Sequence, residues 1–458
     1  MNKIKKTTLL WFAVLLVGGF ILGHIWTKAK YAITEADGFN ELEIAYERII
    51  NNYLNGADER ALIEGAIDGM VKSLDDPYST YHPQEKGEQY ADSYESSFYG
   101  VGAVIKDNNG KFTIESVYKE MPAEKSGLRA NDIIIAVDGQ SAEGLTLLEL
   151  VNKVKGEKDT DVTITVLRDN TELSFTMTRA EIPVYTVESE MLENNLGYIN
   201  ILNFAQETDV EFIEALNKLE QQGMQALILD LRSNPGGLVE QAKNIADVLV
   251  PKGHTIYEIV FKDEKRHISY PSEQKKPFDK EIIVLVNEYS ASASELIAAA
   301  LKESAGAEII GTKTFGKGVV QVFQQFNSGS VLVLTEAQWR TPNGSWINGE
   351  GVEPTKEVKL PEYAYYLPIT ASRLLLNDSG EQVSLLKNWL SAIGYAQTDS
   401  DQFDQTTEEA IKAIQAKNNL EVTGMFDQQL GGYIYSEVAK LLESNDTQLD
   451  AAIKEATN

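Results

Sequence analysis

The sequence contains no cysteine, and only four of its 458 residues are histidines: His24, His82, His254 and His267. The absence of cysteine excludes disulfides, thiolate metal sites and thiol catalysis. No histidine lies in a zinc-type spacing such as His-Glu-x-x-His, and none has a flanking motif typical of a Ser-His-Asp triad. We therefore expect no metal and no cofactor. We interpret the histidines as surface or structural residues.

Positive charge is also scarce. The chain has 41 Lys and Arg residues against 69 Asp and Glu residues, which gives a formal net charge of −28. Such a surface repels phosphates, so we do not expect nucleic-acid binding. The length predicts several domains, each large enough to bury a core.

One uncharged hydrophobic run lies near the N-terminus, from Thr7 to Thr27, directly after Lys3, Lys5 and Lys6. About 20 apolar residues span a bilayer, and basic residues on the N-terminal side place that end in the cytoplasm. A cleaved signal peptide is the alternative, with Thr27-Lys28-Ala29 as a weak cleavage site. We expect residues 1–27 to form a retained single-pass anchor. The rest of the chain would then lie outside the cell membrane.

Residues 28–96 are predicted to be helical. Between 39 and 95 the hydrophobic residues recur at helical spacing, and Asp75-Asp76-Pro77-Tyr78-Ser79 ends the pair of helices. Beyond 182 the pattern changes again: residues 183–360 alternate buried strands with helices, which predicts an α/β layered core. Residues 361–377 are predicted to be a linker, and residues 378–458 a separate helical module.

Residues 97–182 show short strands around one helix. Tyr99-Gly100-Val101-Gly102 opens the segment, a helix with a capping-box pattern starts at Thr146, and 161–177 predicts a hairpin. This order, with 122–128 and Asn131-Asp132, resembles a PDZ domain. The resemblance implies that the glycine-rich opening cradles a peptide carboxylate and that a strand edge accepts the peptide. A tight turn without a ligand would use the same glycines.

Ser292 is the candidate nucleophile. The apolar strand at 282–286 leads into Asn287-Glu288-Tyr289-Ser290-Ala291-Ser292-Ala293-Ser294-Glu295, where helix formers begin. A serine at a helix N-terminus lies where N–H groups and the helix dipole favour developing negative charge. It still needs a base to become nucleophilic. The alternative is that Ser290, Ser292 or Ser294 only caps the helix.

Lys317 is the candidate base, in Phe315-Gly316-Lys317-Gly318-Val319-Val320-Gln321. A lysine acts as a base only when it is deprotonated, and apolar surroundings lower its pKa. If this segment is a strand, Gln321 lies on the same face as Lys317 and could hold the amine by a hydrogen bond. An exposed surface lysine is the commoner alternative.

A third segment could supply the oxyanion hole. Asn234-Pro235-Gly236-Gly237 follows the buried strand at 226–231, and such a run forces a tight turn. Backbone N–H groups of Gly236 or Gly237, with that of Ala293, could stabilise an oxyanion. An ordinary strand-to-helix turn would show the same pattern.

The chain resembles the carboxy-terminal processing proteases, a family of PDZ-containing Ser-Lys peptidases. The resemblance rests on four segments that follow one another along the chain: the PDZ-type opening, the glycine turn, the Ser292 segment and the Lys317 segment. The resemblance covers about residues 39–360. It implies Ser292 as nucleophile, Lys317 as general base, Gln321 as the amide that orients the lysine, and backbone oxyanion donors at Gly236, Gly237 and Ala293. It also implies protein substrates with apolar C-termini, and a homodimer as one oligomeric state.

The tail resembles a peptidoglycan-binding helical domain in segments that include 385–390, 393–395, 403–415 and 424–427, although Asp401-Gln402 stands where a glycine usually precedes Phe403. The resemblance implies cell-wall peptidoglycan as a partner; a small packing or dimerising bundle is the alternative. For the whole chain, the alternative to an enzyme is a non-catalytic scaffold that binds peptides and the cell wall and recruits another protease. An α/β esterase is disfavoured, because the Gly-x-Ser-x-Gly motif is absent.

Overall fold

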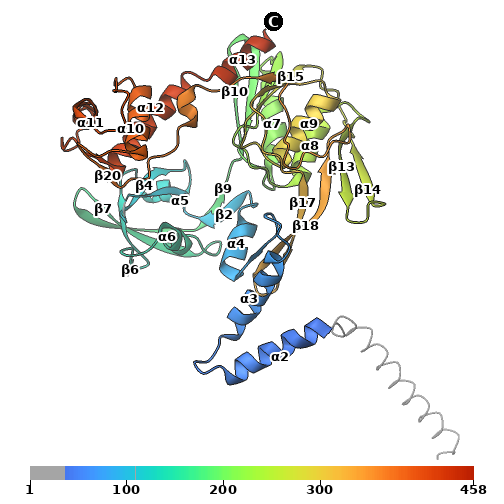
Figure 1. Cartoon of the computed structure of the whole chain (residues 1–458), viewed down its shortest axis with the longest axis horizontal. Helices are drawn as coiled ribbons and strands as arrows, with labels where there is room; N and C mark the ends of the chain where they lie inside the picture. Colours follow the sequence, from blue (N-terminus) through green and yellow to red (C-terminus); the bar gives the residue numbers. More distant parts are fainter. Residues whose placement is uncertain (1–36, 109, 458) are drawn as a thin grey trace, which may run out of the picture. The chain divides into compact units, whose positions relative to one another are not determined.

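The computed structural model describes residues 37–108 and 110–457 (Figure 1). The chain divides into two compact units. The first contains the chain up to Glu88 together with Gln321–Thr335, and the second contains Gln89–Val320 and Glu336–Asn458. The predicted membrane anchor at residues 1–27 lies outside the described residues. Among the residues that are described, no helix is both long and apolar enough to span a membrane.

The first unit contains helices α2 (Asp37–Asn52) and α3 (Glu59–Lys72) and strand β1 (Thr80–His82). The prediction of helices throughout 39–95 was wrong at β1, which pairs antiparallel with Val331–Val333. Local periodicity cannot show this strand, because its hydrogen-bonding partner is remote in sequence. In the same unit the chain turns back between β17 (Val319–Gln325) and β18 (Val331–Arg340). Helix α4 (Gln84–Asp92) continues from one unit into the other.

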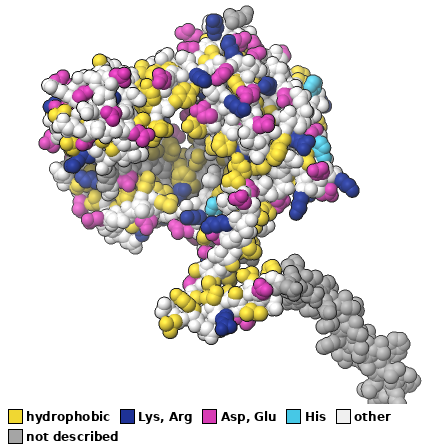
Figure 2. Space-filling model, in the orientation of Figure 1, with side chains coloured by type: hydrophobic (Ala, Val, Ile, Leu, Met, Phe, Trp, Pro, Cys, Tyr) yellow, Lys and Arg dark blue, Asp and Glu magenta, His cyan; other side chains and the backbone are white. Residues whose placement is uncertain are grey.

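Helices α2 and α3 expose many large hydrophobic side chains, and Figure 2 shows several of them in yellow along α2. The exposed set on and beside these helices comprises Phe39, Leu42, Ile44, Ile49, Tyr53, Leu54, Ile63, Met70 and Leu74. Helical periodicity is therefore present in the sequence, but within the described chain these helices leave much of their apolar surface uncovered.

Residues 97–183 form the predicted PDZ-type sheet. Its strand order is β3-β4-β5-β7-β8, with β6 beside β5. The strands are β3 (Ala103–Asp107), β4 (Phe112–Val117), β5 (Ile133–Val137), β6 (Gln140–Ser141), β7 (Asp161–Arg168) and β8 (Thr171–Thr178), while β2 (Ser97–Gly100) pairs with β9 (Ala180–Pro183). The helices are α5 (Pro122–Ser126) and α6 (Leu147–Val154). The predicted capping box between Thr146 and Glu149 is confirmed, as is the β7–β8 hairpin.

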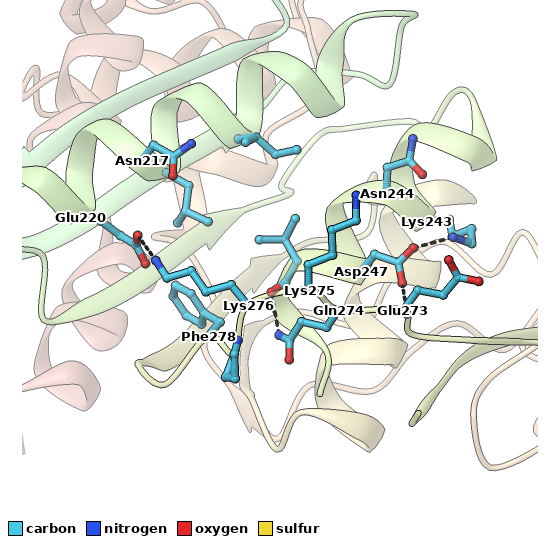
Figure 3. A pocket seen from close by; sticks show the side chains of 14 residues that line it. Asn217, Glu220, Lys243, Asn244, Asp247, Glu273, Gln274, Lys275, Lys276 and Phe278 are labelled. Atoms are coloured by element: carbon cyan, nitrogen blue, oxygen red, sulfur yellow. Dashed lines mark hydrogen bonds and ion pairs between the residues drawn. The ribbon is translucent and has the colours of Figure 1, made fainter. Parts of the chain in front are cut away.

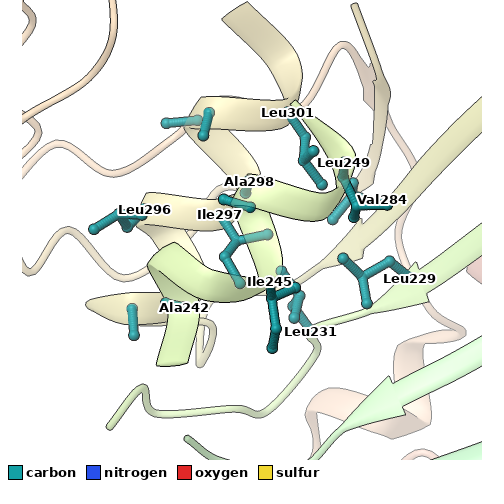
Figure 4. Close-up of a cluster of buried hydrophobic side chains, with 14 of the residues drawn as sticks. Leu229, Leu231, Ala242, Ile245, Leu249, Val284, Leu296, Ile297, Ala298 and Leu301 are labelled. Atoms are coloured by element: carbon teal, nitrogen blue, oxygen red, sulfur yellow. The ribbon is translucent and has the colours of Figure 1, made fainter. Parts of the chain in front are cut away.

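The α/β core is a sheet of order β10-β11-β12-β15-β16-β19 in which β11 to β19 run parallel. These strands are β10 (Val187–Leu192), β11 (Leu196–Ile201), β12 (Ala226–Asp230), β15 (Glu281–Val286), β16 (Glu308–Gly311) and β19 (Lys356–Glu357). Helices α7 (Thr208–Gln221), α8 (Val239–Leu249) and α9 (Ala293–Ser304) pack on one face. Figure 4 shows side chains that α8 and α9 bury there. Strands β13 (Thr255–Phe261) and β14 (His267–Pro271) pair with each other beside this core, and β13 also pairs with Ala337–Arg340 of β18. The predicted alternation of strand and helix is confirmed.

The opposite face of the core sheet is covered by α13 (Thr447–Ala456), the last helix of the chain. Ala452 is fully buried there among strand residues such as Ile228 and Ile283. The rest of the tail has its own hydrophobic core around Leu386, Phe403 and Phe426. Its elements are η2 (Glu362–Tyr365), β20 (Arg373–Leu374), α10 (Glu381–Ala392), α11 (Gln405–Lys417), β21 (Phe426–Asp427) and α12 (Gln428–Glu443). The tail thus forms a compact module, and its last helix covers one face of the core sheet.

Candidate active site

The candidate site is built on two neighbouring parallel strands. β12 and β15 are paired with Asp230 opposite Leu285, so the turns that follow them leave the sheet at the same edge. Asn234 joins the two turns, since its carbonyl accepts the N–H of Ala291 at 3.0 Å and the hydroxyl of Ser294 at 2.9 Å. This places the predicted glycine turn against the predicted nucleophile segment.

Of the three serines in the segment, Ser290 and Ser294 are buried and serve the fold. Their hydroxyls donate to the backbone carbonyls of Leu231 and Asn234 at 2.7 and 2.9 Å. Ser292 is only partly buried and is the N-cap of α9, with φ 55° and ψ −112°. A non-glycine residue at positive φ costs free energy, and such conformations concentrate at functional sites. The helix N-terminus expected for Ser292 is confirmed.

Glu295 connects the nucleophile segment to the lysine segment. Its side chain is fully buried, and its Oε2 accepts the backbone N–H groups of both Ser292 and Lys317 at 2.8 Å. Its Oε1 accepts the N–H of Gly316 and the hydroxyl of Thr314, each at 2.6 Å. Four donors to one carboxylate form a set of charge-assisted hydrogen bonds that fixes both backbones. Sequence reasoning missed this role, although a glutamate three residues after the N-cap is the capping-box signal.

Lys317 is partly buried and precedes β17, which begins at Val319. The strand assumed for Lys317 is therefore absent, and the two-residue alternation gives no argument for a shared face with Gln321. The backbone is instead fixed by indole groups: Trp339 donates to the carbonyl of Lys317 at 2.9 Å and Trp346 to that of Gly318 at 2.8 Å.

Gln321 lies in β17, within the first compact unit. Its side-chain amide donates to the backbone carbonyl of Tyr78. Both residues belong to the same unit, so this bond fixes the glutamine side chain there. The role of Gln321 toward the lysine remains a prediction.

One amide of the glycine turn and one amide of the nucleophile segment are unused. The N–H of Gly236 donates to Oδ1 of Asn234 at 2.9 Å, whereas the N–H groups of Gly237 and Ala293 donate no hydrogen bond to any described residue. A Cβ on Gly236 would lie 2.9 Å from Cβ of Ser292 and 3.1 Å from N of Ala293. Of the two predicted glycines, Gly237 is therefore the one whose amide has no acceptor among the described residues.

The PDZ-type opening contains a small cavity of about 70 Å³. Gly100, Val101 and Gly102 line it, and so do Ile105, Val151 and Val154 on the strand and helix that flank it. The N–H groups of Val101 and Gly102 make no hydrogen bond within the described chain. Tyr99, predicted as a fourth contact, does not line the cavity; it is 38% exposed. The arrangement can accept an apolar side chain beside free amide donors.

A larger cavity of about 480 Å³ lies between α7, α8 and residues 273–278 (Figure 3). Lys276 is paired with Glu220 across it, and Lys243 is paired with Asp247 along α8. Ser292 and Lys317 are not among its lining residues.

The described part of the chain contains three histidines, His82, His254 and His267. His267 is exposed and contacts Glu258, while burial, with a smaller effect of Lys86, lowers the pKa of His82. No group of three metal-ligating side chains occurs among the described residues. His24 lies outside them.

Comparison with known proteins identifies the family. The chain is 38% identical over 427 residues to the carboxy-terminal processing protease CtpA of Bacillus subtilis, covering 93% of this chain and 91% of that protein. This chain belongs to the carboxy-terminal processing proteases of peptidase family S41. The S41 family model matches residues 195–358, the sequence that forms the α/β core. The predicted family is thus confirmed, and the chain is a serine-type C-terminal processing protease.

Other matches cover the remaining parts. Residues 113–168 match the PDZ domain, 379–430 a putative peptidoglycan binding domain, and 24–86 the N-terminal domain of the activating protease CtpB. A probable CtpA-like serine protease of Staphylococcus aureus (strain COL) is 34% identical over 455 residues, 96% of this chain and 92% of that one. The photosystem II D1 C-terminal processing protease is a solved relative, with 29% identity, a TM-score of 0.41, and coverage of 66% of this chain and 84% of that one.

Proposed function

We propose that this S41 protease is anchored in the cell membrane and cleaves extracytoplasmic proteins at or from their C-terminal regions with a Ser292–Lys317 dyad. The observation that carries the dyad is the buried Glu295 carboxylate, which accepts the backbone N–H of both Ser292 and Lys317 at 2.8 Å. A single group therefore sets the positions of the two segments that must meet. The anchor is supported by the uncharged hydrophobic run from Thr7 to Thr27.

In the proposed first step the Oγ of Ser292 attacks the scissile carbonyl carbon while its proton passes to the neutral amine of Lys317. The oxyanion receives hydrogen bonds from the N–H groups of Gly237 and Ala293, which have no other acceptor among the described residues. When the tetrahedral intermediate collapses, the C–N bond breaks and the lysine proton moves to the leaving amine. An acyl-enzyme on Ser292 remains.

In the second step a water molecule gives a proton to Lys317 and attacks the ester carbon. Collapse of this intermediate breaks the ester bond and returns the proton to Oγ of Ser292. Gln321 would orient the lysine amine by a hydrogen bond. The PDZ cavity would bind the substrate C-terminus, with the amides of Val101 and Gly102 on the carboxylate and Val151 beside an apolar side chain.

The test is cleavage of an unstructured protein with an apolar C-terminus. Ser292→Ala and Lys317→Met should each abolish cleavage without lowering the thermal unfolding midpoint. Lys313→Met is the matched control, because Lys313 lies in the same segment but is 51% exposed and paired with Glu353. Full activity in Ser292→Ala or Lys317→Met would refute the dyad.

The anchor and location can be tested separately. In intact cells, the full chain should fractionate with the membrane, and an added protease should digest the catalytic region from outside. Deletion of residues 1–27 should release an active soluble enzyme. Recovery of the intact full chain in the cytosol would contradict the anchored arrangement.

We further propose that residues 378–443 bind peptidoglycan, supported by the match of 379–430 to a peptidoglycan-binding domain. The Ser292→Ala chain should sediment with purified peptidoglycan, and an internal deletion of 369–443 that keeps α13 should not. Equal sedimentation of both would favour the packing-bundle alternative.

A homodimer is proposed from the exposed hydrophobic side chains of α2, such as Leu42 and Ile49, which are 41% and 40% exposed. Soluble proteins rarely leave large apolar patches uncovered. Leu42→Lys with Ile49→Lys should shift the sedimentation coefficient from dimer to monomer. A monomeric wild-type chain would contradict the proposal.

A further inference from the structure

The last helix of the chain is tied to the glycine turn by one arginine. The guanidinium of Arg232 donates from Nε to Oδ1 of Asp230 at 3.0 Å and from Nη2 to Oδ2 of Asp230 at 2.6 Å. From its other side, Nη1 donates to Oδ1 of Asp446 at 2.8 Å and to Oε1 of Gln448 at 3.2 Å. The Arg232 side chain is only 14% exposed, so these bonds lie largely out of water.

Asp446 is held rigidly because it is the N-cap of α13 and accepts the N–H groups of Gln448 and Leu449. Gln448 is fully buried and donates to the carbonyl of Val358 at 2.8 Å. The helix itself packs on the core sheet through the fully buried Ala452. The acceptors that meet Arg232 therefore belong to a fixed element.

Arg232 lies in the turn that ends at Gly236 and Gly237. The next residue, Ser233, has φ 57°, and its N–H donates to Oδ1 of Asn287 at 2.8 Å. The turn is thus held on one side by the segment that leads to Ser292 and on the other by the guanidinium. Because Ser233 adopts a costly conformation, the turn depends on such supports to keep its shape.

We propose that Arg232 and Asp446 are positioning residues for catalysis: α13 holds the glycine turn so that its free amide faces the oxyanion. This inference rests on the proposed Ser292–Lys317 mechanism. The C-terminal helix α13 would then support catalysis by holding the glycine turn, a role separate from that of the peptidoglycan-binding module. Neither residue touches the substrate.

Asp446→Ser is the decisive variant, because serine caps a helix as well as aspartate does but is too short to pair with Arg232. We expect kcat on an unstructured substrate to fall about tenfold, since removal of a whole oxyanion donor costs about 100-fold or more. KM should stay within about twofold, and phosphonylation of Ser292 by a fluorophosphonate should slow as much as kcat. Asp58→Ser, at the exposed N-cap of α3, is the matched control and should change neither rate.

Arg232→Lys is the second variant, used if Asp446→Ser does not fold. It keeps the positive charge beside Asp230 but loses the planar fork that bridges to Asp446. It should show the same loss of kcat and of phosphonylation. Wild-type kcat in the folded variants, or an equal loss in Asp58→Ser, would overturn the inference. An active Ser292→Ala chain would instead overturn the mechanism on which it rests.

Discussion

The backbone N–H of Lys317 donates to Oε2 of Glu295 at 2.8 Å, although the two residues belong to different elements. Lys317 lies in an irregular segment before β17, while Glu295 is in the first turn of α9. The carboxylate is fully buried and receives four donors in all. Its removal would therefore release both segments of the proposed dyad and leave buried N–H groups without an acceptor.

Glu295→Gln should lower kcat by about 100-fold or more, because an NH₂ group replaces one carboxylate oxygen and faces at least one N–H donor in either orientation, which misplaces the catalytic segments. The steady-state rate on an unstructured protein and the thermal unfolding midpoint measure the effect. Glu303→Gln, on the same helix, is the control, since Glu303 accepts only a loop N–H, from Asn343. A Glu295→Gln enzyme as active as Glu303→Gln would show that the bridge is dispensable.

Much of this site could be predicted from the sequence because its parts follow strong local rules. Ser292 lies where a buried strand meets helix formers, and the glycine turn follows another buried strand. Parallel pairing then brings the two turns to one edge of the sheet. The helix start at Ser292 and the strand–helix alternation needed no information from distant residues.

The parts that sequence reasoning missed depend on contacts between distant residues. β1 exists because it pairs with β18, and α13 belongs to the α/β core because it covers the far face of the core sheet. The strand assumed at Lys317 failed because tertiary contacts, the indole groups of Trp339 and Trp346, hold that backbone in an irregular path. Local propensity is overridden where such contacts decide the conformation.

Gly236→Ala should inactivate the enzyme. Gly236 has φ 103°, and a Cβ there would lie 2.8 Å from the carbonyl oxygen of Ala291 and 2.9 Å from Cβ of Ser292. The backbone would have to move, displacing the amides beside the nucleophile, so we expect at least about a 100-fold loss in kcat.

Gly223→Ala separates this clash from the cost of positive φ. Gly223 has φ 91°, but a Cβ at this position would meet no other atom within 4 Å. The variant should lose about 1 kcal/mol of stability and keep its kcat. Stability comes from denaturant titration and kcat from saturated turnover. If the two variants lost equal activity, strain alone would account for the effect.

Val151→Asp should weaken recognition of apolar C-termini. Val151 lines the small cavity beside Gly100 and Gly102, and a carboxylate there would repel the substrate carboxylate and remove apolar contact. We expect KM to rise about tenfold, provided that the PDZ cavity serves binding. Leu148→Asp is the control and should leave KM unchanged, because Leu148 lies in the same helix but is 46% exposed. An unchanged KM in Val151→Asp would mean that this cavity does not bind the substrate.

The tail module should lose stability in acid through Asp404. Burial alone would raise the pKa of Asp404, but hydrogen bonds from Lys387, Thr398 and Thr407 outweigh it and hold the pKa well below its ordinary value. An aspartate whose pKa is lower in the folded state stabilises the fold above its unfolded pKa of about 3.9, and that stability is lost as the pH falls toward the folded pKa. The protection of the α10 and α11 amides against hydrogen exchange, taken relative to an unfolded chain at the same pH, should therefore fall below about pH 4.

Lys387→Met tests the cause. Lys387 is 4% exposed and its amine contacts Asp404 at 2.8 Å, so the variant should lose about 2 kcal/mol of stability at neutral pH, and the acid dependence should flatten. Lys417→Met removes a solvent-exposed partner of Glu437 in the same module and should leave the unfolding midpoint nearly unchanged, because exposed ion pairs contribute little. If both variants kept the wild-type acid dependence, the pairing of Lys387 with Asp404 would not be what lowers the pKa. The loss of stability in acid would then come from the hydrogen bonds of Thr398 and Thr407 to Asp404, or from another carboxylate of the module.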